Sequence, residues 1–276
     1  MAELNEFEWE LDGLLMGDGT PYPVISAEGL EDLADTATEG MDRSDNGRTS
    51  GQSRMRDRAV TITLGPNYWS AAEKNALKAA VSPSVDGVTP KLLRWRPEGE
   101  PTKRALVKPR GKPLDLPGDL SEWVYKSPRA FVNLTAPDPV VYSDATTATA
   151  FEVAGTSGGA DTVAVVNAGS LAATSPGCMT WTITAGASGC VWPYLRHSPN
   201  ANEQWLLSES LTAGQVVTVT TGRVTYLGLT LKLATVKGPS GSPIPFWPVL
   251  RPGSNNIVMG CLDGGFTATL THRSTW

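Results

Sequence analysis

Apolar and polar residues alternate along many short segments of this chain, a pattern typical of half-buried β-strands. The segment RAVTITLG, residues 58–65, alternates Val60, Ile62 and Leu64 with threonines, and YLGLTLKLAT, residues 226–235, places four leucines on one face. The segments GQVVTVTTG and GFTATLTH repeat the same period. Because Gly and Pro recur between these segments, the pattern predicts a mainly β chain with many turns.

One segment has the features of a helix instead. YWSAAEKNALKAAVSP, residues 68–83, contains Ser70 with Glu73 three residues later, the spacing of a capping box. Pro83 is expected to end the helix, because the residue before a proline is disfavoured in helical backbone. The apolar stripe is narrow and consists of Ala72, Ala76, Leu77 and Ala80. We expect one helix packed on a face or an edge of the β-structure.

Two polar segments are predicted to be loops. Residues 38–58, TEGMDRSDNGRTSGQSRMRDR, are basic in their second half, and residues 108–119, KPRGKPLDLPGD, are rich in proline. Residues 17–22, GDGTPY, are expected to form a turn between two N-terminal strands. The preceding FEWELDG, residues 7–13, is interpreted as a strand with one wet face that bears carboxylates.

The composition changes near residues 142–149. Charged residues are common before this point, whereas SDATTATAFEVAGTSGGADTVAVVNAGSLAATSPGC, residues 143–178, is rich in Ala, Gly, Thr and Val. Such a composition suits a sandwich of short strands. We expect two domains, residues 1–142 and 143–276.

Length and charge argue against several classes of protein. With 276 residues, the chain can bury a core without disulfide or metal staples. No run of about 18 apolar residues occurs, so neither a transmembrane helix nor a membrane partner is expected. The acidic segment MAELNEFEWELDG lacks the pattern of a signal peptide, so we expect the protein to stay in the compartment where it is made. The net charge of -5 argues against a general nucleic-acid binder.

Residues that carry chemistry are sparse. The three cysteines, Cys178, Cys190 and Cys261, lack metal-site spacing and are expected to be reduced and partly buried, although a Cys178–Cys190 bridge is geometrically open. His197 and His272 are the only histidines, and both are interpreted as surface or edge residues. Because no nucleophile-elbow, zinc-protease or phosphate-binding motif occurs, the sequence predicts no enzyme, no cofactor and no metal site.

Four tryptophans in the second half allow two interpretations; they are Trp181, Trp192, Trp205 and Trp247. They can form a platform on which sugar rings stack. They can also fill the core of a sandwich, where Trp supplies a large buried area. We favour the core interpretation.

Three stretches occur in a distinctive order. RDRAVTITLGP precedes YWSAAEKNALKAAV, then comes RAFVNLTAPDPVVYS at residues 129–143, and IPFWPVLRPGSNNIVMGC with GGFTATLTHRSTW lies at the C-terminal end. In this order and spacing, the chain resembles the distal tail proteins of long-tailed bacteriophages, also known as phage minor tail proteins. The likeness covers most of the chain.

The resemblance implies an N-terminal split β-barrel with one helix, similar to a tail-tube subunit, and a C-terminal galectin-like β-sandwich. It implies a structural virion protein, made in the host bacterial cytoplasm and located at the tail tip. Such proteins assemble as a homohexameric ring that joins the tail tube protein to the tail tip or baseplate hub protein. The tape measure protein is a further expected partner, and no specific nucleic acid is expected.

The resemblance also implies details of two regions. Pro137 and Pro139 would end the last barrel strand, because neither can donate a ladder hydrogen bond. PVLRPGSNN, residues 248–256, would be a turn between the last strands of the sandwich, with Pro252 and Gly253 as a type II pair. NIVMGC and FTATLTH would pair as the closing hairpin. The sandwich core would receive two more aromatic residues, Phe246 and Trp247.

Residues 38–58 are longer and more charged than a turn needs. We interpret the arginines there as contacts to acidic surface on a neighbouring subunit or ring, with a solvated loop as the alternative. They are Arg48, Arg54, Arg56 and Arg58. The alternative function for the whole chain is a carbohydrate-binding module for host-surface recognition. A hydrolase of cell-wall sugar is disfavoured, because nothing singles out a pair of carboxylates.

Overall fold

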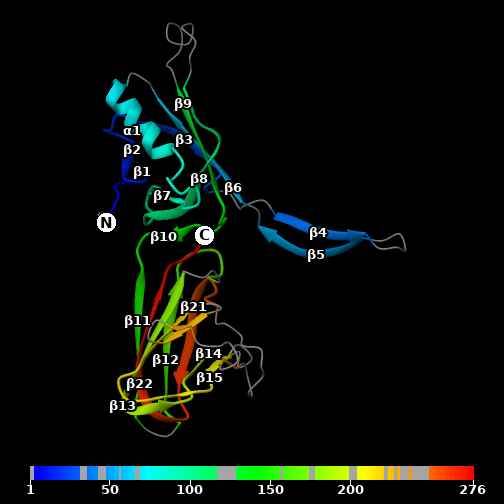
Figure 1. The fold of residues 1–276 in the computed structure, drawn as a ribbon, viewed down its shortest axis with the longest axis vertical. Coiled ribbons are helices and arrows are strands. Elements are labelled where there is room, and N and C mark those ends of the chain that lie inside the picture. Colours follow the sequence, from blue (N-terminus) through cyan, green and yellow to red (C-terminus); the bar gives the residue numbers. More distant parts are fainter. Residues whose placement is uncertain are drawn as a thin grey trace. The chain divides into compact units, whose positions relative to one another are not determined.

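The computed structural model describes residues 3–31, 36–42, 48–55, 57–65, 69–116, 129–155, 158–173, 178–198, 204–220, 223–226, 229–230, 236–237 and 249–276. These ranges are mainly β with one α-helix, as the sequence predicts (Figure 1). None of them contains a helix with the length and hydropathy that crossing a membrane requires. The chain divides into two compact units, Met1–Asp144 and Ala145–Trp276.

One antiparallel sheet dominates the first unit. Its strands follow the order β2-β1-β7-β8-β9-β6-β3, with β10 paired to β8. The strand bounds are β1 Trp9–Leu11, β2 Leu14–Met16, β3 Val24–Glu28, β6 Arg58–Leu64, β7 Lys91–Trp95, β8 Lys103–Asp115, β9 Ala130–Ala136 and β10 Tyr142–Ser143. Residues of even number along β6 and β9 are buried, so this face of the sheet forms the core of the unit. The strand β9 ends directly before Pro137, where the sequence predicts an end.

The helix α1 (Ala71–Val81) begins with the predicted capping box. The Ser70 hydroxyl accepts a hydrogen bond from the Glu73 amide, and the Glu73 carboxylate accepts one from the Ser70 amide at 2.6 Å. The helix ends two residues before Pro83. It contacts β2 and β8 through a narrow face, whose buried residues are Leu77, Ala80 and Val81.

Residues 36–42 and 48–55 form two strands where the sequence predicts a loop. The strand β4 (Thr36–Asp42) pairs antiparallel with β5 (Arg48–Met55) in a two-stranded sheet of its own. The loop prediction for residues 108–119 is also wrong in its first part, because β8 continues to Asp115 and pairs with β9 on both sides of a register shift. Ladder hydrogen bonds come from the backbone, so polar and Gly-rich segments can form strands without the apolar alternation that sequence patterns detect.

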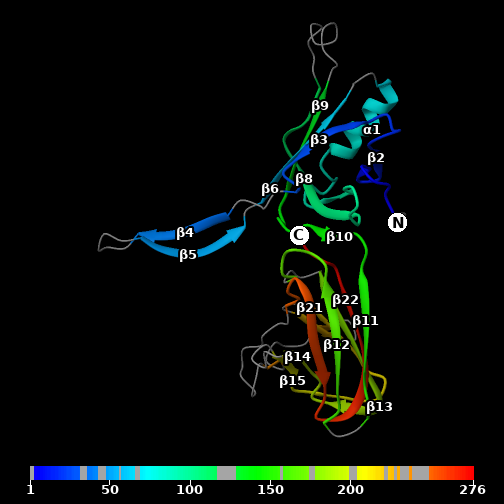
Figure 2. The same cartoon turned by 180° about the vertical axis from the view of Figure 1, so that it is seen from behind.

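The second unit contains two antiparallel sheets whose buried faces supply one core. One sheet has the order β11-β22-β13-β17-β18-β19 with β16 on β13, and the other has the order β12-β21-β14-β15-β20. Both views show β12 beside β21 (Figure 2). The bounds are β11 Thr147–Val153, β12 Ala160–Asn167, β13 Met179–Val191, β14 Tyr194–Ser198, β15 Gln204–Leu207, β16 Ser210–Leu211, β17 Val216–Thr220, β18 Arg223–Tyr226, β19 Leu229–Thr230, β20 Val236–Lys237, β21 Gly253–Gly260 and β22 Asp263–His272.

The predicted closing hairpin is wrong. The strand β21 pairs with β12 and β14, whereas β22 pairs with β11 and β13. Consecutive strands therefore lie in opposite sheets, and the turn between them passes from one sheet to the other. Both strands find apolar partners in either arrangement, so their alternation did not determine the pairing.

Other predictions for the second unit had mixed outcomes. Gly253 has a φ of 85°, as the predicted turn requires, but it begins β21 and does not join the last two strands. A single strand over residues 226–235 is wrong, because Tyr226 of β18 pairs with Leu229 of β19. Phe246 and Trp247 lie outside the described residues.

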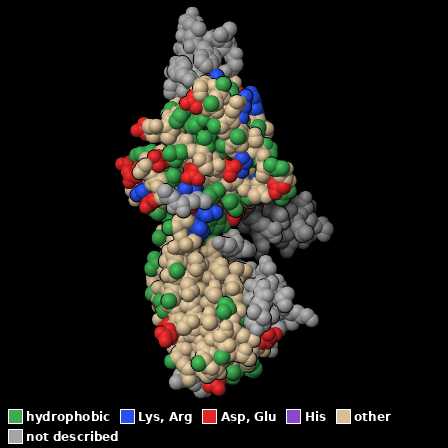
Figure 3. Space-filling view, turned by 60° about the vertical axis from the view of Figure 1, so that its left-hand side comes forward, with side chains coloured by type: hydrophobic (Ala, Val, Ile, Leu, Met, Phe, Trp, Pro, Cys, Tyr) green, Lys and Arg blue, Asp and Glu red, His purple; other side chains and the backbone are tan. Residues whose placement is uncertain are grey.

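The two units differ in surface composition, in line with the change along the sequence. Figure 3 shows many Lys, Arg, Asp and Glu side chains over the first unit. The described surface of the second unit carries few charged side chains on the same face. Charged side chains are therefore concentrated on the first unit.

Candidate functional site

Three of the arginines proposed as contacts belong to the hairpin region. Arg48 and Arg54 lie in β5, and Arg56 lies outside the described residues. The ribbon of β4 and β5 pairs with no other strand in the part of the chain that the structure describes. These three arginines remain predicted contact residues.

Arg58 has a different environment. It begins β6, and its side chain is buried. The guanidinium donates hydrogen bonds to the carbonyl oxygens of Leu30 at 2.6 Å, Gly29 at 3.2 Å and Pro139 at 3.1 Å. Its charge is used inside the first unit and is not presented on the surface. Arg58 is therefore not part of the proposed contact. The burial of Arg58 could have been predicted from the alternation of the strand, because Arg58 lies an even number of residues from the apolar Val60, Ile62 and Leu64 of β6.

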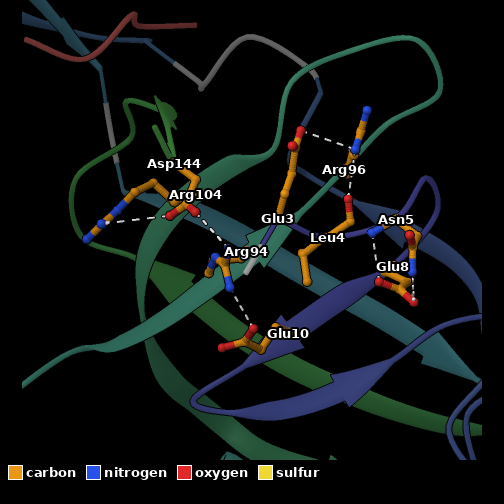
Figure 4. Close-up of polar contacts among 9 residues, drawn as sticks. All are labelled: Glu3, Leu4, Asn5, Glu8, Glu10, Arg94, Arg96, Arg104 and Asp144. Carbon is orange, nitrogen blue, oxygen red and sulfur yellow. Dashed lines mark hydrogen bonds and ion pairs between the residues drawn. The ribbon is translucent and has the colours of Figure 1, made fainter. Parts of the chain in front are cut away.

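An ion-pair network joins β1 and β7 to the end of the first unit (Figure 4). Arg94 on β7 is 2% exposed, and its Nη1 and Nη2 atoms lie 2.7 Å from Glu10 Oε2 and 2.7 Å from Asp144 Oδ2. Arg104 approaches the other oxygen of Asp144 at 4.0 Å. The Asp144 amide donates to the Thr102 carbonyl at 2.8 Å. The last residue of the first unit is thus fixed by side-chain and backbone bonds.

The strand register explains how these charges meet. Arg94 lies opposite Glu10 of β1 on one side and opposite Arg104 of β8 on the other. Directly opposed residues share a face of the sheet, and opposite charges in such positions attract. Glu10 is one of the alternating carboxylates of residues 7–13, interpreted from the sequence as the wet face of a strand. Its partner lies in the neighbouring strand and could not be inferred from spacing along the chain. Sequence reasoning missed this network.

The N-terminal segment is held against the segment after β7. The Arg96 Nη1 atom donates to the Leu4 carbonyl at 2.9 Å and lies 3.2 Å from Glu3 Oε1 (Figure 4). Nearby, Glu8 accepts hydrogen bonds from the Asn5 side chain and the Asn5 amide, and these bonds lower the pKa of the Glu8 carboxyl. The segment that precedes β1 is therefore ordered by polar contacts.

A second buried cation is paired at the adjacent register position, where Lys103 lies opposite Trp95. Lys103 on β8 is 4% exposed, and its Nζ atom lies 3.0 Å from Glu31 Oε2 and 2.7 Å from Glu100 Oε2. Trp95 donates to the other oxygen of Glu31 at 2.9 Å. Burial would raise the pKa of Glu31, but the hydrogen bonds from Trp95 and Lys103 outweigh it and lower the pKa. These ion pairs hold the segments of Glu31 and Glu100 against β8, and the charges of this cluster are engaged with one another.

The histidines are buried, so their interpretation as surface or edge residues is wrong. The His197 Nε2 atom lies 3.0 Å from Asn255 Oδ1, and the His272 Nε2 atom donates to the Val166 carbonyl at 3.1 Å. Burial lowers the pKa of His272. Among the described residues, no group of three or more His, Cys, Asp or Glu residues could hold a metal ion.

The cysteines are free and buried, as predicted. The thiol of Cys190 contacts that of Cys261, and Cys178 is not the neighbour of Cys190. Burial raises the pKa of the Cys190 and Cys261 thiols, which disfavours the reactive thiolate. Neither thiol therefore has the environment of a nucleophile.

The tryptophans of the second unit divide into two kinds. Trp181 and Trp205 are buried and belong to the core, as favoured from the sequence. Trp192 is 45% exposed, and Trp247 lies outside the described residues. A sugar-stacking platform built from all four is therefore excluded.

Comparison with known proteins identifies the fold. A scan against protein-family models and a search of curated proteins return no match. Among solved structures, the SPP1 Dit (gp 19.1) protein, described as a paradigm of hub adsorption apparatus in Gram-positive infecting phages, matches with a TM-score of 0.63 at 11% identity, covering 98% of this chain and 99% of that chain. The chain has the fold of a phage Dit protein.

Two further solved structures are similar at a lower level. Chains of the phage p2 baseplate in its activated conformation match with TM-scores of 0.42 with Sr and 0.43 with Ca, at 8% and 7% identity. They cover 95% and 99% of this chain, and 97% and 98% of theirs. The Dit fold agrees with the resemblance to distal tail proteins, because it spans both units.

Proposed function

We propose that this protein is a structural component of a phage virion, the distal adaptor ring that joins the tail tube to the tail tip or baseplate hub. The observation that carries the proposal is the match of fold to SPP1 Dit, which covers 98% of this chain and 99% of that chain. The buried cations Arg94 and Lys103 of the first unit support it, since their charges are used in ion pairs within the unit. The proposed role is structural and involves no catalysis.

The ring itself is the finer part of the proposal. Six copies would close by rotation through heterologous contacts, in which one patch of each subunit meets a different patch of the next. The ribbon of β4 and β5 is the proposed contact, because the outer edges of a two-stranded sheet offer backbone donors and acceptors to another chain. Arg48, Arg54 and Arg56 would add charge to this contact. The ring would meet the tail tube protein on one face and the hub protein, with the tape measure protein, on the other.

Light scattering on the purified protein and electron microscopy of isolated tails test the proposal. The expected result is a hexamer and a density ring at the tail tip that binds an antibody against this chain. Substitution of Glu for Arg48, Arg54 and Arg56 should abolish the hexamer and leave the thermal unfolding of the subunit unchanged. The same substitution at Arg110, an exposed arginine of β8, is the matched control. A monomer at high concentration, together with absence from purified particles, refutes the proposal.

A further inference from the structure

The end of the second unit away from Ala145 carries an exposed apolar pair. We call it the distal end, and it comprises residues 152–155, 158–161, 186–194, 208–210 and 260–264. Trp192, directly after β13, is 45% exposed, and Leu262, between β21 and β22, is 55% exposed. Val191 pairs with Asp263, and the Leu262 amide donates to the Val191 carbonyl at 2.9 Å. The two apolar residues therefore lie next to the last pair of the ladder, one on each strand.

The backbone at the distal end holds this pair in place. Trp192 has a φ of 51°, a left-handed conformation that bulky residues rarely adopt and that persists only where the surrounding structure enforces it. The neighbouring turns are in close contact, because a Cβ atom at Gly264 would lie 2.3 Å from the Gly189 carbonyl oxygen. The Pro193 carbonyl accepts a hydrogen bond from the Leu207 amide at 2.9 Å. The backbone that carries Trp192 is therefore ordered before binding, which lowers the entropy cost of an interface at this residue.

Two carboxylates, Glu209 and Asp263, adjoin the apolar pair in the strand register. Ser210 pairs with Val191 on the side away from Asp263, which brings Glu209 to the flank of Trp192 opposite Leu262. The acidic residues of the distal end are Glu152, Asp161, Glu209 and Asp263. In the ranges that the structure describes, none of them forms a salt bridge. The lower half of the second unit in Figure 3 shows red side chains and no blue ones.

Most described basic residues of this unit lie elsewhere. Arg251 precedes β21 and Arg273 follows β22, at the end where β11 begins. Arg196 on β14 lies two residues from Tyr194 of the distal end, and its guanidinium lies over the Tyr194 ring, 5.8 Å from the ring centre. Lys237 on β20 pairs with Leu206, which in turn pairs with Tyr194. Among the described residues, the distal end therefore combines exposed apolar surface with carboxylates that form no salt bridge.

We propose that the distal end binds another virion protein, through a surface that presents Lys or Arg side chains around an apolar depression for Trp192; this inference rests on the proposed function. A cation beside Trp gains from the ring face and from the carboxylates together. Desolvated Trp residues at the centre of an interface contribute a large share of binding energy. The carboxylates and the apolar pair thus both favour a partner surface with Lys or Arg side chains around an apolar depression.

The same observations favour a protein over a glycan. Leu262 adds an exposed aliphatic side chain, whereas sugar rings stack on aromatic faces. Two carboxylates already accept backbone hydrogen bonds, since Asp263 Oδ1 bonds to the Gly264 amide and Asp161 Oδ2 to the Glu152 amide. Part of the acceptor capacity of Asp161 and Asp263 is therefore already used, whereas sugar hydroxyls require several free acceptors. The negative charge of both carboxylates remains available to a cation.

Zero-length carbodiimide cross-linking of intact tails, followed by peptide mass spectrometry, tests the proposal directly. The reagent joins a carboxylate to a lysine amine that contacts it. We expect an amide bond between Glu209 or Asp263 and a lysine of another tail protein, and protection of both carboxylates from a soluble amine in tails compared with the free protein. Equal labelling of both carboxylates in tails and in free protein overturns the inference. Absence of this chain from purified particles overturns the proposed function, and this inference with it.

Variants separate the roles of the side chains. Trp192→Asn keeps a residue that tolerates left-handed backbone and should lower the cross-link yield by about tenfold. Leu262→Ser, which leaves the backbone of Trp192 untouched, should lower it in the same direction. Val166→Ser is the control, because Val166 is 56% exposed on β12 near its far end. Unchanged yields in both test variants contradict the proposal. A second contradicting result is that the wild-type protein binds a glycan array, that Trp192→Asn abolishes this binding, and that the soluble amine still labels the carboxylates in tails.

Discussion

Asp144 Oδ2 lies 2.7 Å from Arg94 Nη2, so the residue at which the first unit ends is bonded to a guanidinium in the middle of its sheet. Arg94 is 2% exposed, and its second partner, Glu10, belongs to another strand. We expect Arg94→Met to lower the free energy of unfolding by about 3 kcal/mol, because it leaves two partly buried carboxylates without their cation. Urea unfolding, followed by circular dichroism, measures the loss.

Arg104→Met is the matched control for this prediction. Arg104 is 25% exposed and lies 4.0 Å from Asp144, so its removal should cost less than about 1 kcal/mol. Similar losses in both variants would show that the network acts through net charge alone. A negligible loss in Arg94→Met would refute the importance of the buried pair.

The parts of the fold that depend on local sequence could be predicted. The capping box of α1 involves only Ser70 and Glu73, which are three residues apart, and the structure contains it. The strand that ends before Pro137 follows from the missing amide of proline. Such features are fixed by neighbours along the chain, so a single sequence suffices to find them.

The parts that depend on distant pairing could not be predicted. Glu10 meets Arg94 because β1 and β7 are neighbours in the sheet, which no spacing along the chain reveals. The alternation of residues in β21 and β22 identifies both strands but does not assign them to a sheet. Arg58 is the instructive case, since its position in a basic run suggested a surface while its parity within β6 indicated the core.

Trp205 and Trp192 should respond differently to truncation. Trp205 is 1% exposed in the sandwich core, so Trp205→Ala should lower the free energy of unfolding by about 3–5 kcal/mol. Trp192→Ala should change it by less than about 1 kcal/mol, because half of the side chain already faces water. Thermal and urea unfolding of the two variants under the same conditions provide the comparison. A large loss at Trp192 would mean that the distal end needs this side chain for folding.

Gly264 and Gly214 form a matched pair for a test of close packing at the distal end. Both have positive φ, at 79° and 74°, so alanine pays the left-handed cost of about 1 kcal/mol at either site. A Cβ at Gly264 would also lie 2.3 Å from the Gly189 carbonyl oxygen, whereas nothing lies within 4 Å at Gly214. We therefore expect Gly264→Ala to destabilise the second unit clearly more than Gly214→Ala, as measured by the urea midpoint. Equal midpoints would indicate that the two turns can move apart freely.

His272 should make the stability of the second unit depend on pH. Its side chain is 1% exposed, and burial lowers its pKa below the ordinary 6.5. In the unfolded chain the imidazole takes up a proton as the pH falls through that value, whereas the folded protein resists protonation until its lower pKa is reached. The contribution of neutral His272 to the free energy of unfolding is therefore fully present above pH 6.5, and it declines as the pH falls toward the pKa of the folded state.

His272→Gln tests this dependence. Glutamine retains an N–H group for the Val166 carbonyl, which His272 Nε2 reaches at 3.1 Å, but it does not titrate. The variant should unfold at a midpoint that varies less between about pH 7 and pH 5 than that of the wild type, whatever its absolute stability. The slope of the urea midpoint against pH is the quantity to compare, because a buried substitution also shifts the level. Parallel slopes for the two proteins would assign the acid sensitivity to other groups.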